Sequence, residues 1–201
     1  AAASLVLLAS LTGLLTGAAG AVGAAVPANA VDPEVNVPVP QAPVAEPEDP
    51  IRASEYWLDK YGVREAWKTT RGKGVTIAVI DTGIAKGPVE FEGAVVGGTD
   101  VSGVGSHDGR TPVGVVDSAH GSWVGSLAAA RGTGVDAGMI GVAPEASLLS
   151  ISVGFTASSS RVPFSEQIAT AMRWAVDNGA DIINLSFTTN TLDWDESWDD
   201  A

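Results

Sequence analysis

The sequence predicts an α/β fold with a mostly parallel sheet flanked by helices. Residues 75–80 form a near-continuous apolar run, of the kind found in strands that are buried on both faces of a parallel sheet. Residues 165–178 place apolar side chains at helical spacing, between two further apolar stretches. Because strands and helices alternate from residue 74 to residue 187, we expect right-handed crossover connections.

Two segments without a predicted core precede this domain. Residues 1–30 carry no charged side chain and end in Pro-Ala-Asn-Ala, a small-x-small pattern typical of signal peptidase cleavage. We therefore expect a signal peptide over 1–30 and a mature start at Val31. The alternative is a retained membrane anchor, because the apolar stretch exceeds the length of a spanning helix. Residues 31–50 mix six prolines with Asp and Glu, which predicts an extended acidic linker.

The predicted domain occupies residues 51–201. Small side chains after His120 predict a helix that packs close to the sheet. Gly179 lies where a glycine would end the helix expected at residues 165–178. Aromatic and apolar residues near the start, Trp57, Leu58, Tyr61 and Trp67, are assigned to core or edge packing. The expected elements are, in order, a helix at 63–68, strands at 75–80 and 95–101, a helix at 119–130, a strand at 146–153, a helix at 165–178, a strand at 181–186 and a helix from 192 to 201.

Composition excludes several classes of function. The chain has no cysteine, so it holds no disulfide and no thiol nucleophile. Its formal net charge of −13 argues against a nucleic-acid partner, because binding phosphates requires clustered Lys and Arg. With its apolar leader, the domain is expected outside the cytoplasm, secreted or at the cell surface. A membrane contact is expected only if the leader is retained or a further segment anchors the chain.

Asp81 is the first candidate for chemistry. It ends the apolar run of residues 75–80 and is followed by Thr82 and Gly83, so its carboxylate lies where open α/β sheets place their active crevices. An aspartate at this position can equally be a turn-forming or capping residue. Asp81 alone therefore leaves both interpretations open.

His120 is the second candidate. It opens the small-residue helix, so it can be held at a fixed distance from a strand end, as a general base oriented by a carboxylate must be. A single histidine at a helix start is otherwise an ordinary surface residue. Asp81 and His120, read together and in this order, favour two members of a catalytic triad. The other histidine, His107, and its neighbour Asp108 are assigned to a solvated turn.

With two further motifs, Gly-Val-Ala-Pro-Glu-Ala at 141–146 and Asp-Ile-Ile-Asn-Leu-Ser at 181–186, these stretches resemble the subtilases, the subtilisin-like serine peptidases. The resemblance covers residues 51–201, about the front half of a subtilase catalytic domain. It implies a three-layer subtilisin-like fold, truncated at the C-terminus. It also implies that Asp81 is the triad aspartate and His120 the triad histidine.

The implied activity is that of an exported serine endopeptidase acting on proteins or peptides, without a cofactor for its chemistry. His120 would take the proton of a serine hydroxyl, and Asp81 would orient the imidazole. The Gly-Thr-Ser motif of the nucleophile and the oxyanion-hole asparagine do not occur in these 201 residues. We therefore expect this polypeptide, as given, to be catalytically inert.

The resemblance also implies a substrate-binding segment. Ser186, Phe187 and Thr188 align with a family segment, usually Ser-Leu-Gly, whose backbone pairs with the substrate as an added strand. Residues 158–160 would line the opposite edge of the cleft or form a flexible serine loop. Subtilases often bind structural calcium, and Glu90 and Asp136 are the nearest candidates, but the loop at 131–139 lacks the usual Asn-rich pattern, so the metal is left undecided.

Two other classes of function remain. A pseudoprotease or surface-binding module with the same fold would lack the serine nucleophile altogether. A nucleotide-binding α/β protein is disfavoured, because Asp81 is not followed by G-x-G-x-x-G and the chain has no phosphate loop of the form G-x-x-x-x-G-K-[ST].

Overall fold

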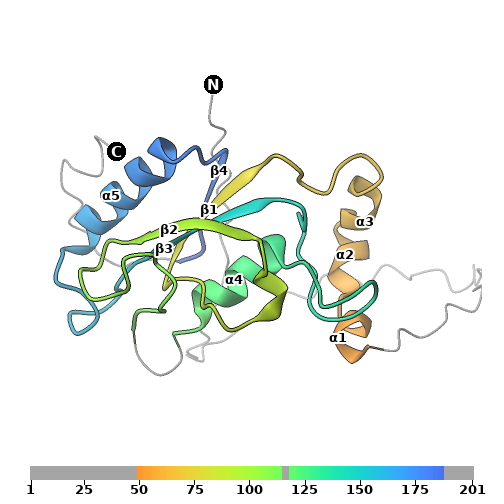
Figure 1. The fold of residues 1–201 in the computed structure, drawn as a ribbon, viewed down its shortest axis with the longest axis horizontal. Helices are drawn as coiled ribbons and strands as arrows, with labels where there is room; N and C mark the ends of the chain where they lie inside the picture. The colour runs from red at the N-terminus through yellow and green to blue at the C-terminus, as the bar shows by residue number, and fades with distance from the viewer. Residues whose placement is uncertain (1–48, 115–117, 188–201) are drawn as a thin grey trace, which may run out of the picture. The chain divides into compact units, whose positions relative to one another are not determined.

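The sheet of this protein is fully parallel and has the strand order β2-β3-β1-β4. We describe it from a computed structural model that places residues 49–114 and 118–187. Figure 1 shows the arrangement of the helices around the sheet. The four strands are β1 (Thr76–Asp81), β2 (Val95–Asp100), β3 (Ser147–Ser152) and β4 (Ile182–Leu185).

Strand β1 is central, with β3 on one side and β4 on the other. Its register pairs Asp81 with Ser152 of β3, and Ile80 with Leu185 of β4. The last five residues of β1 are all buried, which explains why this strand reads as an unbroken apolar run. Since parallel strands point the same way, the carboxyl ends of β1, β2 and β3 meet at one edge of the sheet.

Two helices cover opposite faces of the sheet. Side chains of α5 (Phe164–Asp177), among them Ile168, pack with Ala78 and Ile80 of β1. Side chains of α4 (His120–Ala129) pack instead with Ile77 and Val79. Because successive strand residues face opposite sides, these two sets define separate cores and a three-layer α/β/α arrangement. Figure 1 shows α4 and α5 on the two sides of the strands. The predicted α/β class is confirmed.

A smaller cluster of apolar residues lies beside the sheet. It joins Leu58 of α2 (Tyr56–Lys60) and Val63 of α3 (Val63–Ala66) to Ile140. Trp57 and Trp67 pack against this cluster as expected, but Tyr61 is 73% exposed, so its assignment to packing is wrong. Tyr61 follows α2 as its C-cap, and Nζ of Lys60 lies 5.7 Å from the centroid of its exposed ring.

The remaining elements are two short helices, α1 (Pro50–Ala53) and the 3₁₀ helix η1 (Val89–Phe91). Neither was predicted, nor was α2, because helices of about one turn carry too little periodicity to be recognised. The other predicted elements agree with the observed bounds to within one or two residues. Gly179 has φ +78° directly after the cap of α5, as a helix-ending glycine requires. The predicted signal peptide, the helix from residue 192 and residues 31–48 of the linker lie outside the described residues.

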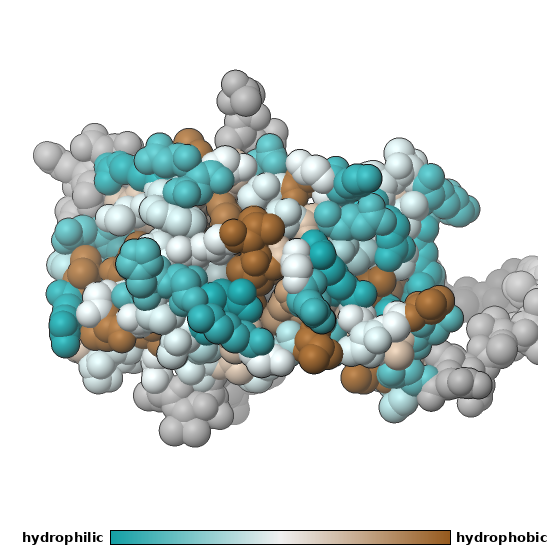
Figure 2. Space-filling model, in the orientation of Figure 1, coloured by the Kyte–Doolittle hydropathy of each residue, from teal (hydrophilic) through white to brown (hydrophobic). Residues whose placement is uncertain are grey.

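Most of the face drawn in Figure 2 is hydrophilic, with hydrophobic residues gathered in a few separate groups. The apolar residues of α4 that face outward include Trp123 and Leu127, which are 60% and 50% exposed. Within residues 49–114 and 118–187, no helix has the length and apolar character needed to cross a membrane.

Candidate active site

The structure brings Asp81 and His120 into direct contact. Asp81 is the last residue of β1 and His120 the first residue of α4. The Nδ1 atom of His120 lies 2.9 Å from Oδ1 and 2.9 Å from Oδ2 of Asp81. Because an ionised carboxylate only accepts hydrogen bonds, we assign the proton to Nδ1. The other ring nitrogen, Nε2, then carries the lone pair that can accept a proton.

The two side chains differ sharply in exposure. The Asp81 side chain is fully buried, whereas that of His120 is 47% exposed. Oδ1 of Asp81 also accepts a hydrogen bond of 2.7 Å from the backbone N–H of Thr82, which fixes the carboxylate plane. This is the arrangement that a solvent-accessible base with a buried orienting group requires. The ring of Trp123 meets that of His120 edge-on, with centroids 6.4 Å apart.

Thr82 ties the end of β1 to the start of α4. Its hydroxyl donates to the carbonyl of Ser118 at 2.7 Å and accepts from the N–H of Gly121 at 2.9 Å. The sequence indicated Thr82 only as a neighbour of Asp81. Its role depends on a helix almost forty residues later, so no local pattern could have revealed it.

Two glycines allow this close approach. Gly83 has φ +104°, a conformation that other residues rarely adopt. A Cβ added to Gly121 would lie 2.6 Å from the carbonyl oxygen and 2.8 Å from the nitrogen of Gly83. Backbone therefore meets backbone where β1 ends and α4 begins, and only glycine fits at position 121.

Serines of β3 hold the segment that follows Asp81. The hydroxyl of Ser150 accepts from the N–H of Ile84 at 2.8 Å and donates to the carbonyl of Gly109 at 2.7 Å. That of Ser152 donates to Asp100 at 2.7 Å. Both serines are fully buried. The Ser150 hydroxyl satisfies two backbone groups that cannot reach water, and the Ser152 hydroxyl satisfies the Asp100 carboxylate.

We expect Ser150→Ala to destabilise the fold, because the substitution leaves one buried N–H and one buried carbonyl without their partner. The expected loss in the free energy of unfolding is about 1–3 kcal/mol. Urea unfolding followed by tryptophan fluorescence measures it. Ser158→Ala, which changes an exposed serine, is the control, and an equal loss in both variants would contradict this role for Ser150.

Residues 106–110 contain the predicted turn, and hydrogen bonds and an ion pair hold it to the rest of the fold. His107 is exposed as expected, but Asp108 forms an ion pair of 2.6 Å with Lys86 and accepts from Ser106. These contacts, that with Lys86 first, hold the pKa of the Asp108 carboxyl well below its usual range. Arg110 donates to the carbonyls of Ile84 at 2.7 Å and Ala85 at 3.0 Å, and its partial burial lowers its pKa. Asp108 lies in a turn and its side chain is 44% exposed, as predicted, and the turn is also tied to Lys86.

The predicted substrate segment is described in part. Ser186 and Phe187 directly follow β4, whereas Thr188 lies outside the described residues. The Phe187 ring packs against Phe155 and Phe164, with centroids 5.1 and 5.7 Å away. Phe187 is therefore anchored through its side chain, which leaves its backbone as the part that can meet a peptide.

A hollow of about 250 Å³ lies beside the candidate cleft edge at residues 158–160. Ser158 and Ser159 line one side, and residues 111–114 line another. Val113 connects this hollow to the candidate site, because its N–H donates to the carbonyl of Thr82 at 2.8 Å. Ser159 is buried and bonded to Thr156, so this stretch is an ordered turn rather than a loose serine loop.

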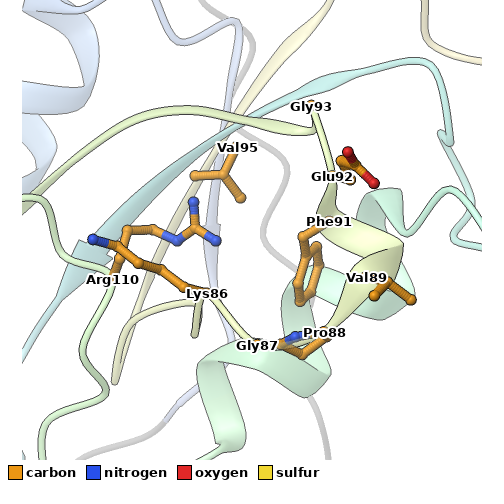
Figure 3. A pocket seen from close by; sticks show the side chains of 9 residues that line it. All are labelled: Lys86, Gly87, Pro88, Val89, Phe91, Glu92, Gly93, Val95 and Arg110. Atoms are coloured by element: carbon orange, nitrogen blue, oxygen red, sulfur yellow. The ribbon is translucent and has the colours of Figure 1, made fainter.

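Figure 3 shows a second hollow, of about 390 Å³, which does not include Asp81 or His120. Phe91 and Val95 supply apolar walls, and the cationic side chains of Lys86 and Arg110 lie at one end. Both cations already have partners within the fold. We assign no ligand to this hollow.

The calcium candidates do not fit a metal ion. Asp136 is exposed near the tip of a hairpin, and Glu90 lies in η1. In the part of the chain that the structure describes, no group of three or more His, Asp or Glu side chains is close enough to hold a metal. A calcium ion usually needs six to eight oxygen ligands, which these two carboxylates cannot supply.

Comparison with known proteins identifies the family. The model of the subtilase family, Peptidase_S8, matches residues 72–201. This chain belongs to the subtilase family. The match includes both residues of the Asp81–His120 pair and all four strands of the subtilase sheet described above.

Individual subtilases are similar over most of the domain. Thermitase of Thermoactinomyces vulgaris is 33% identical over 141 residues, which cover 70% of this chain and 47% of thermitase. Mycosin-4 of Mycobacterium tuberculosis is 35% identical over 130 residues, which cover 61% of this chain and 27% of mycosin-4. The solved structure of the MycP3 protease from the type VII (ESX-3) secretion system is 32% identical, has a TM-score of 0.53, and matches 70% of this chain and 39% of MycP3. The chain thus spans less than half the length of each.

Proposed function

We propose that this chain is the aspartate- and histidine-bearing part of a subtilisin-like serine endopeptidase. The contact of His120 Nδ1 with both carboxylate oxygens of Asp81 carries this proposal. The supporting context is membership of a family of serine peptidases and the placement of the pair at the carboxyl edge of the sheet. The chemistry needs no metal or organic cofactor, because the triad itself moves the proton.

In this mechanism, Nε2 of His120 takes the proton of a serine hydroxyl while the serine oxygen bonds to the peptide carbonyl carbon. The same proton then passes to the leaving amine as the peptide bond breaks, and a water repeats the cycle to release the acyl group. Asp81 stays ionised and stabilises the imidazolium that forms in each half. The serine must come from outside these 201 residues, since no Gly-Thr-Ser motif is present in them.

A protein or peptide substrate would lie along the carboxyl edge of the sheet. We propose that the backbone of Ser186, Phe187 and Thr188 pairs with it on one side and that residues 158–160 border it on the other. Two observations support this: Phe187 is anchored by its ring, and the hollow at Ser158 and Ser159 is connected through Val113 to the candidate site. We further propose that the enzyme is exported, on the strength of the leader at 1–30.

The chain offers a matched pair of histidines for the test. The full-length protein that contains this chain is compared with His120→Ala and His107→Ala, for labelling by a fluorophosphonate serine probe and for cleavage of casein. Labelling and cleavage should be present in the wild type and in His107→Ala, and lost in His120→Ala. His107 is exposed and makes no contact with the pair, so its variant controls for the loss of a histidine as such.

The alternative is a pseudoprotease or surface-binding module with the subtilase fold. It is supported if the full-length wild type, like His120→Ala, is not labelled by the probe and does not cleave casein. The proposed activity is then wrong even though the fold is unchanged.

A further inference from the structure

A hairpin over residues 131–141 directly follows α4. Its two arms are joined by antiparallel bridges between Arg131 and Ile140 and between Gly134 and Ala137. The return arm then closes the end of α4, because the N–H of Gly141 donates to the carbonyl of Ala130 at 2.9 Å. The two residues that follow, 142 and 143, donate to carbonyls of the last turn of α4. The hairpin therefore satisfies backbone groups that the helix itself leaves open.

Three side chains from the N-terminal segment reach this hairpin. Oδ2 of Asp49, the cap of α1, accepts from the N–H of Gly138 at 3.0 Å. Oε1 of Glu55 accepts from the N–H of Ile140 at 2.9 Å. Between them, Nη2 of Arg52 donates to the carbonyl of Ala137 at 3.1 Å.

Arg52 is buried at the centre of these contacts. Its side chain is 10% exposed and that of Glu55 is 2% exposed, and the two form an ion pair of 3.4 Å. Among the described residues, Nε of Arg52 is the one buried side-chain nitrogen or oxygen without a hydrogen-bond partner. The position in which the guanidinium bonds both Glu55 and Ala137 therefore leaves its Nε–H without a hydrogen-bond partner, which is unfavourable.

The hairpin is shaped around the guanidinium. A Cβ added to Gly132 would lie 2.5 Å from Nη2 of Arg52, so glycine leaves room for the cation. A buried carboxylate and a backbone carbonyl face one positive group, which is the ligand chemistry that a hard metal cation such as calcium prefers. Here the guanidinium already fills the space.

We propose that Arg52 is a built-in cation that holds the hairpin closed in place of a bound metal ion. The guanidinium of Arg52 is a planar fork that reaches Glu55 and Ala137 with separate nitrogens. The end of α4 is thereby held by the chain itself, independent of dissolved calcium. The proposal does not depend on peptidase activity, so a structural readout on the full-length protein that contains this chain tests it separately.

Hydrogen exchange of the Gly138 and Ile140 amides is the readout, because both are bonded to carboxylates of this cluster. In the wild type, exchange at these amides should be the same in EDTA and in millimolar calcium chloride. Arg52→Ala should speed it by about tenfold or more, because Glu55 is left buried without its partner. Millimolar methylguanidinium should slow exchange again in Arg52→Ala and have no effect in the wild type.

Two further variants separate charge from packing. Arg52→Met keeps most of the side-chain volume and should show the same fast exchange, so it also serves if Arg52→Ala does not fold. Arg64→Ala removes an exposed arginine of α3 and should leave both amides unchanged. The proposal is overturned if Arg52→Met exchanges at the wild-type rate, or if calcium slows exchange at these amides in the wild type.

Discussion

In the full-length protein, Asp81→Asn should lower kcat/KM for a peptide substrate by about 10⁴-fold, with KM little changed. The asparagine amide can donate to Nδ1 of His120, which moves the histidine proton to Nε2. A histidine in that tautomer cannot accept the serine proton. Steady-state kinetics on a chromogenic peptide measure the effect, and His120→Ala should lose at least as much.

The control for this substitution is Asp59→Asn, which changes an aspartate of α2 whose side chain is 70% exposed and paired with Arg64. It should keep wild-type kinetics. A drop of less than tenfold in Asp81→Asn would mean that the contact with His120 does not orient a general base, and would remove the main support for the proposed triad.

The second large effect is expected from Gly121→Ala. The added Cβ would lie 2.6 and 2.8 Å from backbone atoms of Gly83, which cannot move without shifting the end of β1. The expected loss in the free energy of unfolding is about 1–3 kcal/mol, although alanine is intrinsically the better helix former. Urea unfolding of the full-length protein that contains this chain measures the loss.

NMR of the same variant tests the link to the site. The Nδ1–H proton of His120, bonded to Asp81, should give a downfield resonance in the wild type and lose it in Gly121→Ala. Gly87→Ala is the matched control, because its Cβ would meet nothing within 4 Å, and it should keep both stability and the resonance. An unperturbed resonance in Gly121→Ala would show that the pair tolerates a wider gap between β1 and α4.

The strands were predictable because a strand that is buried on both faces consists mostly of consecutive apolar residues. The last five residues of β1 are all buried, and Ile77 to Ile80 read as an apolar run. The last five residues of β3 are also all buried, but only Leu148, Leu149 and Ile151 among them are apolar. Helix α5 was predictable from the spacing of Ile168, Ala171 and Ala175, all fully buried. Strand β2 was harder, since only Val95 and Val96 are apolar before its two glycines.

The contact between Asp81 and His120 could be expected from their order and from the small residues around His120. The supporting contacts could not. Thr82, Ser150 and Arg52 act through partners 36 to 85 positions away in the chain, and nothing near them in sequence indicates those partners. A single polar residue carries no periodicity, so its role appears only when the fold brings its partner to it.

The central place of β1 has a consequence for how the protein folds. Both of its neighbours come later in the chain, about 70 residues later for β3 and about 105 for β4. During synthesis, the first strand to emerge must therefore wait unpaired until much of the domain has been made. Contacts of such long sequence separation are slow to form, because the entropy of closing the long loops is lost before the contacts stabilise the chain. Asp81, which would orient the base, is thus synthesised early but reaches its functional position only when β3 and β4 have paired with β1.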